Sequence, residues 1–134
     1  MSLEENKALM RQWTDGMNRR DPGIVDETCA PDWGSAHGGP EPVKQYLAAW
    51  FAAFPDGVWT IDDLIAEGEL VATGYTFTGT NTGAYQGRAP TGKRVTFRGV
   101  WIDQIHDGKF VGPAGRGMDD RLAWMTELGM VTPS

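Results

Sequence analysis

The sequence has few of the residues that metal sites and disulfides require. Among 134 residues there is one cysteine, Cys29, and there are two histidines, His37 and His106. A single cysteine excludes an intrachain disulfide and a cysteine-rich zinc site. The two histidines do not have the His-x-His or His-x₃-His spacing that places two metal ligands on one face. We therefore expect neither a metal nor another cofactor.

Basic residues are also scarce. Twelve Lys and Arg stand against 18 Asp and Glu, which gives a formal net charge of −6. Nucleic-acid binding needs clustered Lys and Arg to neutralise phosphates, so we expect no nucleic-acid partner. No apolar run approaches the ~18 residues that span a bilayer, and no charged-then-apolar leader opens the chain. These absences predict a cytoplasmic protein without a membrane partner.

Two sequence motifs that would indicate an enzyme class are incomplete or missing. The segment 87–93 has the glycine and lysine spacing of a phosphate-binding loop, but Arg94 stands where that loop requires Ser or Thr. A strand is expected to follow it, whereas a phosphate-binding loop leads into a helix. There is no Gly-x-Ser-x-Gly elbow of a serine hydrolase either. Nucleotide binding and serine hydrolysis are therefore not favoured.

Glycine and tryptophan, by contrast, are abundant, with 18 and 6 copies respectively. Glycines indicate turns or close backbone approaches, and tryptophans need a core or a pocket to bury them. The length predicts one domain over residues 1–134. Helical spacing of apolar residues predicts helices over 2–18, 22–29, 41–54 and 120–128.

The second half changes to the two-residue period of strands. We expect strands over 58–65, 70–79, 94–105 and 109–112, with hairpin turns at 67–69 and at Asp107-Gly108. Helices followed by hairpin-linked strands predict an α+β fold with a curved antiparallel sheet, the helices covering one face and enclosing an apolar pocket.

Asp103 is the strongest candidate for chemistry. The odd positions of its strand carry Val95, Phe97, Trp101 and Ile105, so strict alternation places Asp103 on the apolar face. A carboxylate desolvated there would have a raised pKa, as a general base or acid near neutral pH requires. Two alternatives stay open: a β-bulge that turns Asp103 outward, or an ion pair with an arginine.

Other candidates have structural alternatives. Trp101 and Phe97 share the face of Asp103 and would give a substrate a flat wall, and Trp50 belongs to the apolar face of the helix over 41–54. Tyr75 fits a core position, from which its hydroxyl reaches a cavity. Asp119 and Asp120 open the last helix, where an aspartate is common as an N-cap. His37 lies in a glycine-rich loop, where a histidine is more often solvated.

Several segments together resemble a known family. They are Ala30-Pro31-Asp32, Phe54-Pro55-Asp56, the run from Ile61 to Gly68, Thr76-Phe77-Thr78-Gly79-Thr80, Pro90-Thr91-Gly92-Lys93 and Asp107-Gly108-Lys109. In these the chain is similar to SnoaL-like polyketide cyclases of the nuclear transport factor 2-like superfamily. The resemblance implies a cone of curved sheet and helices around a deep pocket, and a homodimer. It also implies ring closure by intramolecular aldol condensation without a cofactor, with Asp120 at the catalytic position and His37 as a catalytic partner.

The chain departs from the family pattern around the expected pocket. The segment 110–117 is two residues longer than usual and lacks the polar side chains found there in relatives. Trp101 followed by Asp103 reverses the usual order of an aspartate and a large apolar residue, and Gly74 replaces a larger side chain. These changes indicate a divergent substrate, or a pocket rebuilt for a new proton-transfer reaction with Asp103 as the base.

Three functions are therefore compatible with the sequence. The first is a cyclase-, isomerase- or lyase-type acid–base enzyme acting on a hydrophobic aromatic or polycyclic small molecule. In it Tyr75, His37 or Arg116 would stabilise the oxyanion. The second is a non-catalytic binding protein for such a molecule. The third is an epoxide or ester hydrolase that holds a water between Asp103 and Arg98 or Arg116.

Overall fold

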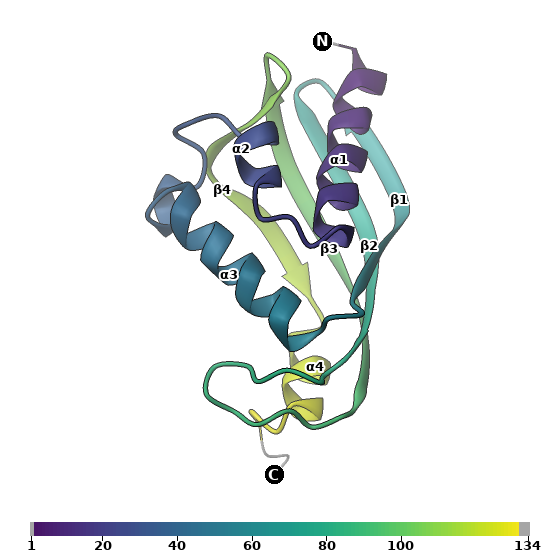
Figure 1. Ribbon diagram of the computed structural model, residues 1–134. Coiled ribbons are helices and arrows are strands. Elements are labelled where there is room, and N and C mark those ends of the chain that lie inside the picture. Colours follow the sequence, from purple (N-terminus) through teal and green to yellow (C-terminus); the bar gives the residue numbers. More distant parts are fainter. Residues whose placement is uncertain (1, 132–134) are drawn as a thin grey trace.

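The computed structural model describes residues 2–131, which form helices followed by a four-stranded sheet (Figure 1). The helices are α1 (Leu3–Asn18), α2 (Ile24–Thr28), the short 3₁₀ helix η1 (Ser35–His37), α3 (Pro40–Ala53) and α4 (Arg121–Glu127). The strands are β1 (Val58–Glu67), β2 (Leu70–Thr80), β3 (Arg94–His106) and β4 (Lys109–Asp119). They pair antiparallel in the order β1-β2-β3-β4. The expected α+β architecture is confirmed.

Local signals explain where the two long helices begin and end. The Oγ of Ser2 accepts a hydrogen bond from the Glu5 amide at 3.1 Å, which satisfies a free N–H at the start of α1. Pro40 opens α3, because a proline at the first position sacrifices no helical hydrogen bond. Both helices turn an apolar stripe toward the sheet and leave polar residues in solvent.

The sheet alternates as the sequence predicts. On β2 and β3 the inward positions are buried or half-buried and the outward positions are more exposed. Asp107 and Gly108 both have positive φ, at 49° and 73°, which is the conformation of the tight turns that match strand twist. The helices α1, α2 and α3 all lie on the same side of this sheet, and α4 lies at its lower end (Figure 1).

Strand β4 is longer than expected. The sequence predicts a strand that stops near Gly112, because Gly112 and Pro113 are unfavourable in a regular ladder. The structure instead continues the strand to Asp119 through a bulge. Pairing passes from Gln104 with Val111 to Ile102 with Arg116, so the register shifts between Ile102 and Gln104, at Asp103. Gly112, with φ of 104°, allows this bulge, and pairing with β3 still satisfies the rest of the strand.

The glycine-rich loop between β2 and β3 is organised by a buried amide. Asn81 Oδ1 accepts hydrogen bonds from the amide and the hydroxyl of Thr91 at 2.8 and 3.0 Å. Its Nδ2 donates to the carbonyls of Gly83 and Ala53 at 2.9 and 3.3 Å. The segment that has the spacing of a phosphate-binding loop is therefore folded onto Asn81 and followed by a strand.

We predict that Asn81→Ala destabilises the protein by about 2–3 kcal/mol, because it leaves buried carbonyl and amide groups without partners. Chemical denaturation measures this change. The control is Thr78→Ala on the exposed face of the sheet, which should stay within about 0.5 kcal/mol of the wild type. Equal stabilities of the two variants would contradict the assigned role of Asn81.

Candidate active site

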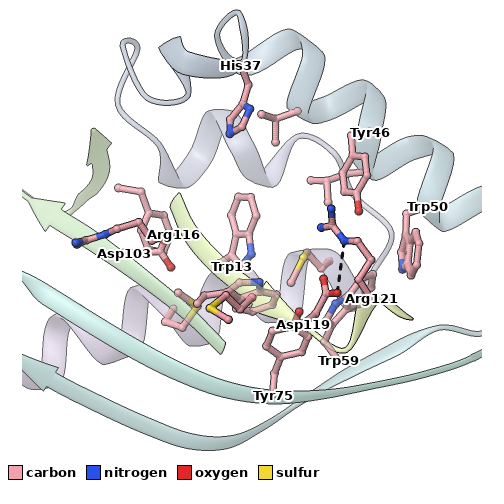
Figure 2. A pocket seen from close by; sticks show the side chains of 18 of the residues that line it. Trp13, His37, Tyr46, Trp50, Trp59, Tyr75, Asp103, Arg116, Asp119 and Arg121 are labelled. Atoms are coloured by element: carbon pink, nitrogen blue, oxygen red, sulfur yellow. Dashed lines mark ion pairs between the residues drawn. The ribbon is translucent and has the colours of Figure 1, made fainter. Parts of the chain in front are cut away.

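A cavity of about 510 Å³ lies between the inner face of the sheet and the helices α1 and α3 (Figure 2). Its walls are mainly aromatic and aliphatic side chains. The most relevant of the lining residues are Trp13, Trp33, His37, Tyr46, Trp50, Trp59, Tyr75, Phe97, Trp101, Asp103, Phe110, Arg116, Asp119, Arg121 and Trp124. A concave, largely apolar site with a few polar groups is typical of small-molecule binding.

Asp103 lines this cavity. It keeps its register with Val71 of β2, and the bulge lies in β4, so the carboxylate is not turned outward. Burial raises the pKa of Asp103 to about 6, and the positive charge of Arg116 opposes part of that rise. Figure 2 shows both side chains at the same end of the cavity. Within residues 2–131 no arginine approaches Asp103 closely enough for an ion pair.

An aromatic pair lies on the inner face of the sheet, with Trp101 two positions before Asp103 on β3 and Tyr75 opposite Gly99 on β2. The rings of Tyr75 and Trp101 stack with centroids 4.0 Å apart and planes inclined by 21°. Gly99, on the inner face of β3, makes room for this arrangement, because a Cβ at that position would overlap the Tyr75 hydroxyl and ring. Burial also raises the pKa of Tyr75, so its phenol stays protonated and can donate a hydrogen bond.

The two aspartates near the end of β4 have different surroundings. Asp120 is exposed and caps α4, accepting a hydrogen bond from the Ala123 amide at 3.3 Å. It does not line the cavity, so the structure does not bring Asp120, the position taken from the resemblance, together with Asp103. Asp119 lines the cavity instead; its Oδ1 accepts a hydrogen bond from Trp124 Nε1 at 3.1 Å and lies 3.7 Å from Arg121 Nε.

The length of β4 explains why Asp119, and not Asp120, lines the cavity. Because the strand continues to Asp119, its alternation places Asp119 on the inner face beside Gly99. The sequence prediction ended the strand at Gly112 and therefore treated both aspartates as part of the helix start. The sequence prediction would have identified Asp119 if it had continued the inward–outward alternation of strand side chains up to the start of the last helix.

The structure brings the other predicted residues together. His37, Trp50, Tyr75, Phe97, Trp101 and Arg116 all line the cavity with Asp103. His37 is exposed and comes from η1, across the cavity from the sheet (Figure 2). The sequence reasoning did not select Tyr46, Trp59 or Arg121, whose helix and strand positions fit a packed core or a solvated surface equally well.

No three His, Cys, Asp or Glu side chains among residues 2–131 gather in a way that would hold a metal ion. No helix within the same residues has the length and apolar character needed to cross a membrane.

Comparison with known proteins identifies the family. The model of the SnoaL-like polyketide cyclases matches residues 7–128, and the chain belongs to this family. Its fold is the nuclear transport factor 2-like cone that the resemblance implied. No match was found among curated proteins.

Solved structures share this architecture. AclR from Streptomyces galilaeus is 26% identical with a TM-score of 0.84, covering 98% of this chain and 89% of its own. TsrD from Streptomyces laurentii is 24% identical with a TM-score of 0.85, covering 98% and 99%. IdmH from Streptomyces antibioticus is 22% identical with a TM-score of 0.76, covering 92% and 98%.

The raised pKa of Asp103 predicts a pH-dependent stability. Ionisation is harder in the folded chain than in the unfolded chain, where an aspartate has a pKa of about 3.9. The folded state therefore loses stability as the pH rises from about 4 through about 6, and the loss is complete above both values. Asp103→Asn should gain up to about 3 kcal/mol over the wild type between those limits.

Denaturation of both proteins at several pH values measures this difference. Arg116→Ala should raise the pKa of Asp103 further, because it removes the opposing positive charge. The matched control is Arg98→Ala on the outer face of the sheet, where Arg98 pairs with Asp62 at 3.8 Å. A pH-independent gap between wild type and Asp103→Asn would contradict the assignment.

Gly99→Ala should disturb the aromatic pair, at a cost of about 1–3 kcal/mol, which is typical of overpacking. In a Tyr75→Ala background the cost should be smaller, because that change removes the hydroxyl and the ring carbons that the new methyl group would overlap. Thermal denaturation of the four proteins measures the coupling. The same cost in both backgrounds would contradict the close approach.

Proposed function

We propose that this protein is a cofactor-free acid–base enzyme that removes a proton from a carbon beside a carbonyl group of an aromatic or polycyclic small molecule. The observation that carries the proposal is Asp103, a carboxylate with a pKa raised to about 6 inside an aromatic cavity. Family membership supports a cyclase-type role on a small molecule.

The proposed chemistry begins with the Asp103 carboxylate accepting the proton. A base with a pKa near 6 is mostly ionised at neutral pH and is still a stronger base than an ordinary aspartate. The negative charge moves to the carbonyl oxygen of the substrate, where the protonated phenol of Tyr75, the His37 ring or the Arg116 guanidinium would stabilise it. Preorganised donors of this kind are often the largest contribution to catalysis.

The enolate then has two outcomes that balance its atoms and charges. In an isomerisation it takes the proton back from Asp103 at another carbon. In an aldol-type cyclisation its carbon attacks a second carbonyl of the same molecule, a C–C bond forms, and the resulting alkoxide takes the proton from Asp103. Neither route needs an oxidant, a reductant or a co-reactant.

The walls indicate the shape of the substrate. The stacked rings of Tyr75 and Trp101 present a flat aromatic surface in the cavity, and Trp101 stands two positions before Asp103 on β3. Flat surfaces of this kind favour a planar conjugated ligand, which stacks on them without rearrangement.

A hydrolase is the second candidate, supported by the position of Arg116. Asp103 and Arg116 lie at the same end of the cavity, where together they would hold and deprotonate a water (Figure 2). We rank it lower because the adjoining wall is aromatic and offers few partners for a polar ester or epoxide product.

The test is deuterium exchange into β-tetralone, a ketone with an acidic benzylic CH₂, followed by NMR in D₂O. The wild type should accelerate exchange, with a rate that rises through an apparent pKa near 6 because the ionised carboxylate is the active form. Asp103→Asn should lower the rate by about 10²–10⁴-fold, the usual contribution of a general base.

Two further variants sharpen the test. Asp107→Asn, in the exposed turn, should exchange at the wild-type rate. Asp120→Asn discriminates between the carboxylates: loss of exchange in this variant with retention in Asp103→Asn would show that Asp103 is not the base. Binding of β-tetralone without any exchange would favour the binding-protein alternative.

A further inference from the structure

Each end of the cavity has one aspartate and one arginine (Figure 2). Asp103 and Arg116 lie at one end. Asp119 and Arg121 lie at the other, and Asp119 pairs with Gly99, which stands four positions before Asp103 on β3. Four strand residues span about 13 Å. The proposed proton transfer uses Asp103 and leaves the pair of Asp119 and Arg121 without an assigned role.

Arg121 is held in position by two partners. Its Nε lies 3.7 Å from Asp119 Oδ1, and the central carbon of its guanidinium lies 6.0 Å from the centre of the Trp124 ring. A cation over an indole face is attracted to it within about 6 Å. Trp124 is only 5% exposed, and its Nε1 donates to the same Asp119 oxygen at 3.1 Å. These contacts restrict a long side chain that would otherwise lose rotamer freedom on binding a ligand.

The hydrogen-bonding capacity of this guanidinium is unused. A guanidinium has five N–H donors, and its hydrogen bonds to carboxylates are about 2.7–2.9 Å long. The 3.7 Å approach to Asp119 is longer than that, and within residues 2–131 Arg121 makes no hydrogen bond. Because the approach is through Nε, the two terminal NH₂ groups lie farther from Asp119. Figure 2 shows the guanidinium between Asp119 on the sheet and Tyr46 on α3.

The positive charge of Arg121 acts inside the cavity as well as at its surface. Arg121 lines the cavity although 68% of its side chain is exposed, so it lies at the opening to solvent. Burial and the negative charge of Asp119 raise the pKa of Tyr75, and the positive charge of Arg121 opposes that rise. An anionic group of a ligand at this end of the cavity would therefore meet an attractive charge.

A ligand that fills this end has to replace the water on the terminal N–H groups. A neutral carbonyl offers one oxygen and no charge, and taking water away from a charge without supplying a partner is costly. A carboxylate accepts two parallel N–H bonds from one guanidinium and matches both its charge and its planar shape. Asp119 approaches the Nε edge, so the terminal edge of Arg121 is left for the ligand.

We propose that Arg121 determines substrate specificity by binding a carboxylate of the ligand at the cavity opening, with Asp119 and Trp124 holding the guanidinium in position. The substrate is then an aromatic ketone that carries an acid group on the side remote from the carbon that loses its proton. This inference rests on the proposed function for the ketone and its reacting carbon. The carboxylate site itself rests on the geometry around Arg121.

The test uses two probes that each carry both groups. β-Tetralone-6-carboxylate has the ketone and its acidic benzylic CH₂ at one end of a flat bicyclic skeleton and a carboxylate at the other. β-Tetralone-6-carboxamide has the same shape without the charge. Calorimetric titrations at neutral pH give the preference, defined as the dissociation constant of the carboxamide divided by that of the carboxylate. The wild type should prefer the carboxylate, and added salt should weaken the preference because it screens exposed charges.

Arg121→Gln removes the guanidinium at an exposed position. We expect the preference to fall about tenfold, the effect of a charge-assisted hydrogen bond. Arg98→Gln is the matched control, because Arg98 is similarly exposed, at 76% against 68%, and lies on the outer face of the sheet. It makes the same change in net charge and should keep the wild-type preference.

Two further measurements locate the carboxylate. A larger loss of preference in Arg116→Gln than in Arg121→Gln would place it at the Asp103 end and overturn the inference. In ¹⁵N spectra of the wild type, the two complexes should differ more at the Trp124 indole N–H than at the Trp101 indole N–H, which lies two positions before Asp103. This comparison needs no variant, so it decides even if Arg121→Gln does not fold, and a larger difference at Trp101 would overturn the inference.

Equal affinities of the wild type for the two probes, no binding of either, or an unchanged preference in folded Arg121→Gln would also overturn it. Deuterium exchange of the same CH₂ group separates this inference from the proposed function. An Arg121-dependent preference with unimpaired exchange in Asp103→Asn would support the carboxylate site and contradict the proposed function. Impaired exchange in Asp103→Asn with equal affinities for the two probes would do the opposite.

Discussion

The cavity depends on the pairing of β2 with β3. This ladder runs from Leu70 opposite Gln104 to Thr80 opposite Arg94 without a register shift. Because side chains alternate strictly along such a ladder, a shift by one residue would move every inner side chain to the solvent face. The outer strands are less regular, since β1 and β4 each contain a shift where they pair with this central hairpin. The central β2–β3 pair therefore fixes which residues face inward, and the edge strands β1 and β4 contain the register shifts.

The main electrostatic feature of the site is that burial removes Asp103 from water and a nearby positive charge offsets only part of the cost. Asp103 has an apolar inner face around it and the bulge of β4 opposite, and the charge of Arg116 offsets only part of the cost. Asp119, at the other end of the cavity, accepts an indole N–H and lies close to Arg121. One chain thus places two carboxylates in one cavity with different partners. Acid–base sites frequently contain two carboxylates whose different surroundings give them different pKa values.

The aromatic residues have two functions that only their neighbours distinguish. Phe54 and Phe77 pack ring against ring in the core and do not line the cavity. Tyr75 and Trp101 belong to the same network, yet they also form a wall, because Gly99 leaves the space that the Tyr75 ring occupies. The abundance of glycine and tryptophan in the sequence is consistent with such close packing around an open volume.

The sequence by itself determined the order of elements and the inner face of the central strands. The two-residue period of β3 was sufficient to place Phe97, Trp101 and Asp103 inward, since alternation is a local property of an extended chain. The same pattern extended to Tyr75 on the neighbouring strand, and the family was recognisable from its short motifs.

Only the tertiary structure decided the rest. Whether β4 ended at Gly112 or continued to Asp119 depended on its hydrogen bonds to β3. The composition of this segment, rich in glycine and containing a proline, does not predict those hydrogen bonds. That extension separated Asp119, in the cavity, from Asp120, at the helix cap. Within residues 2–131 the indole N–H of Trp50 makes no hydrogen bond, and this too was invisible in the sequence. Helical spacing places an indole on the buried face of α3, but whether its nitrogen meets an acceptor depends on which side chains other elements bring beside it.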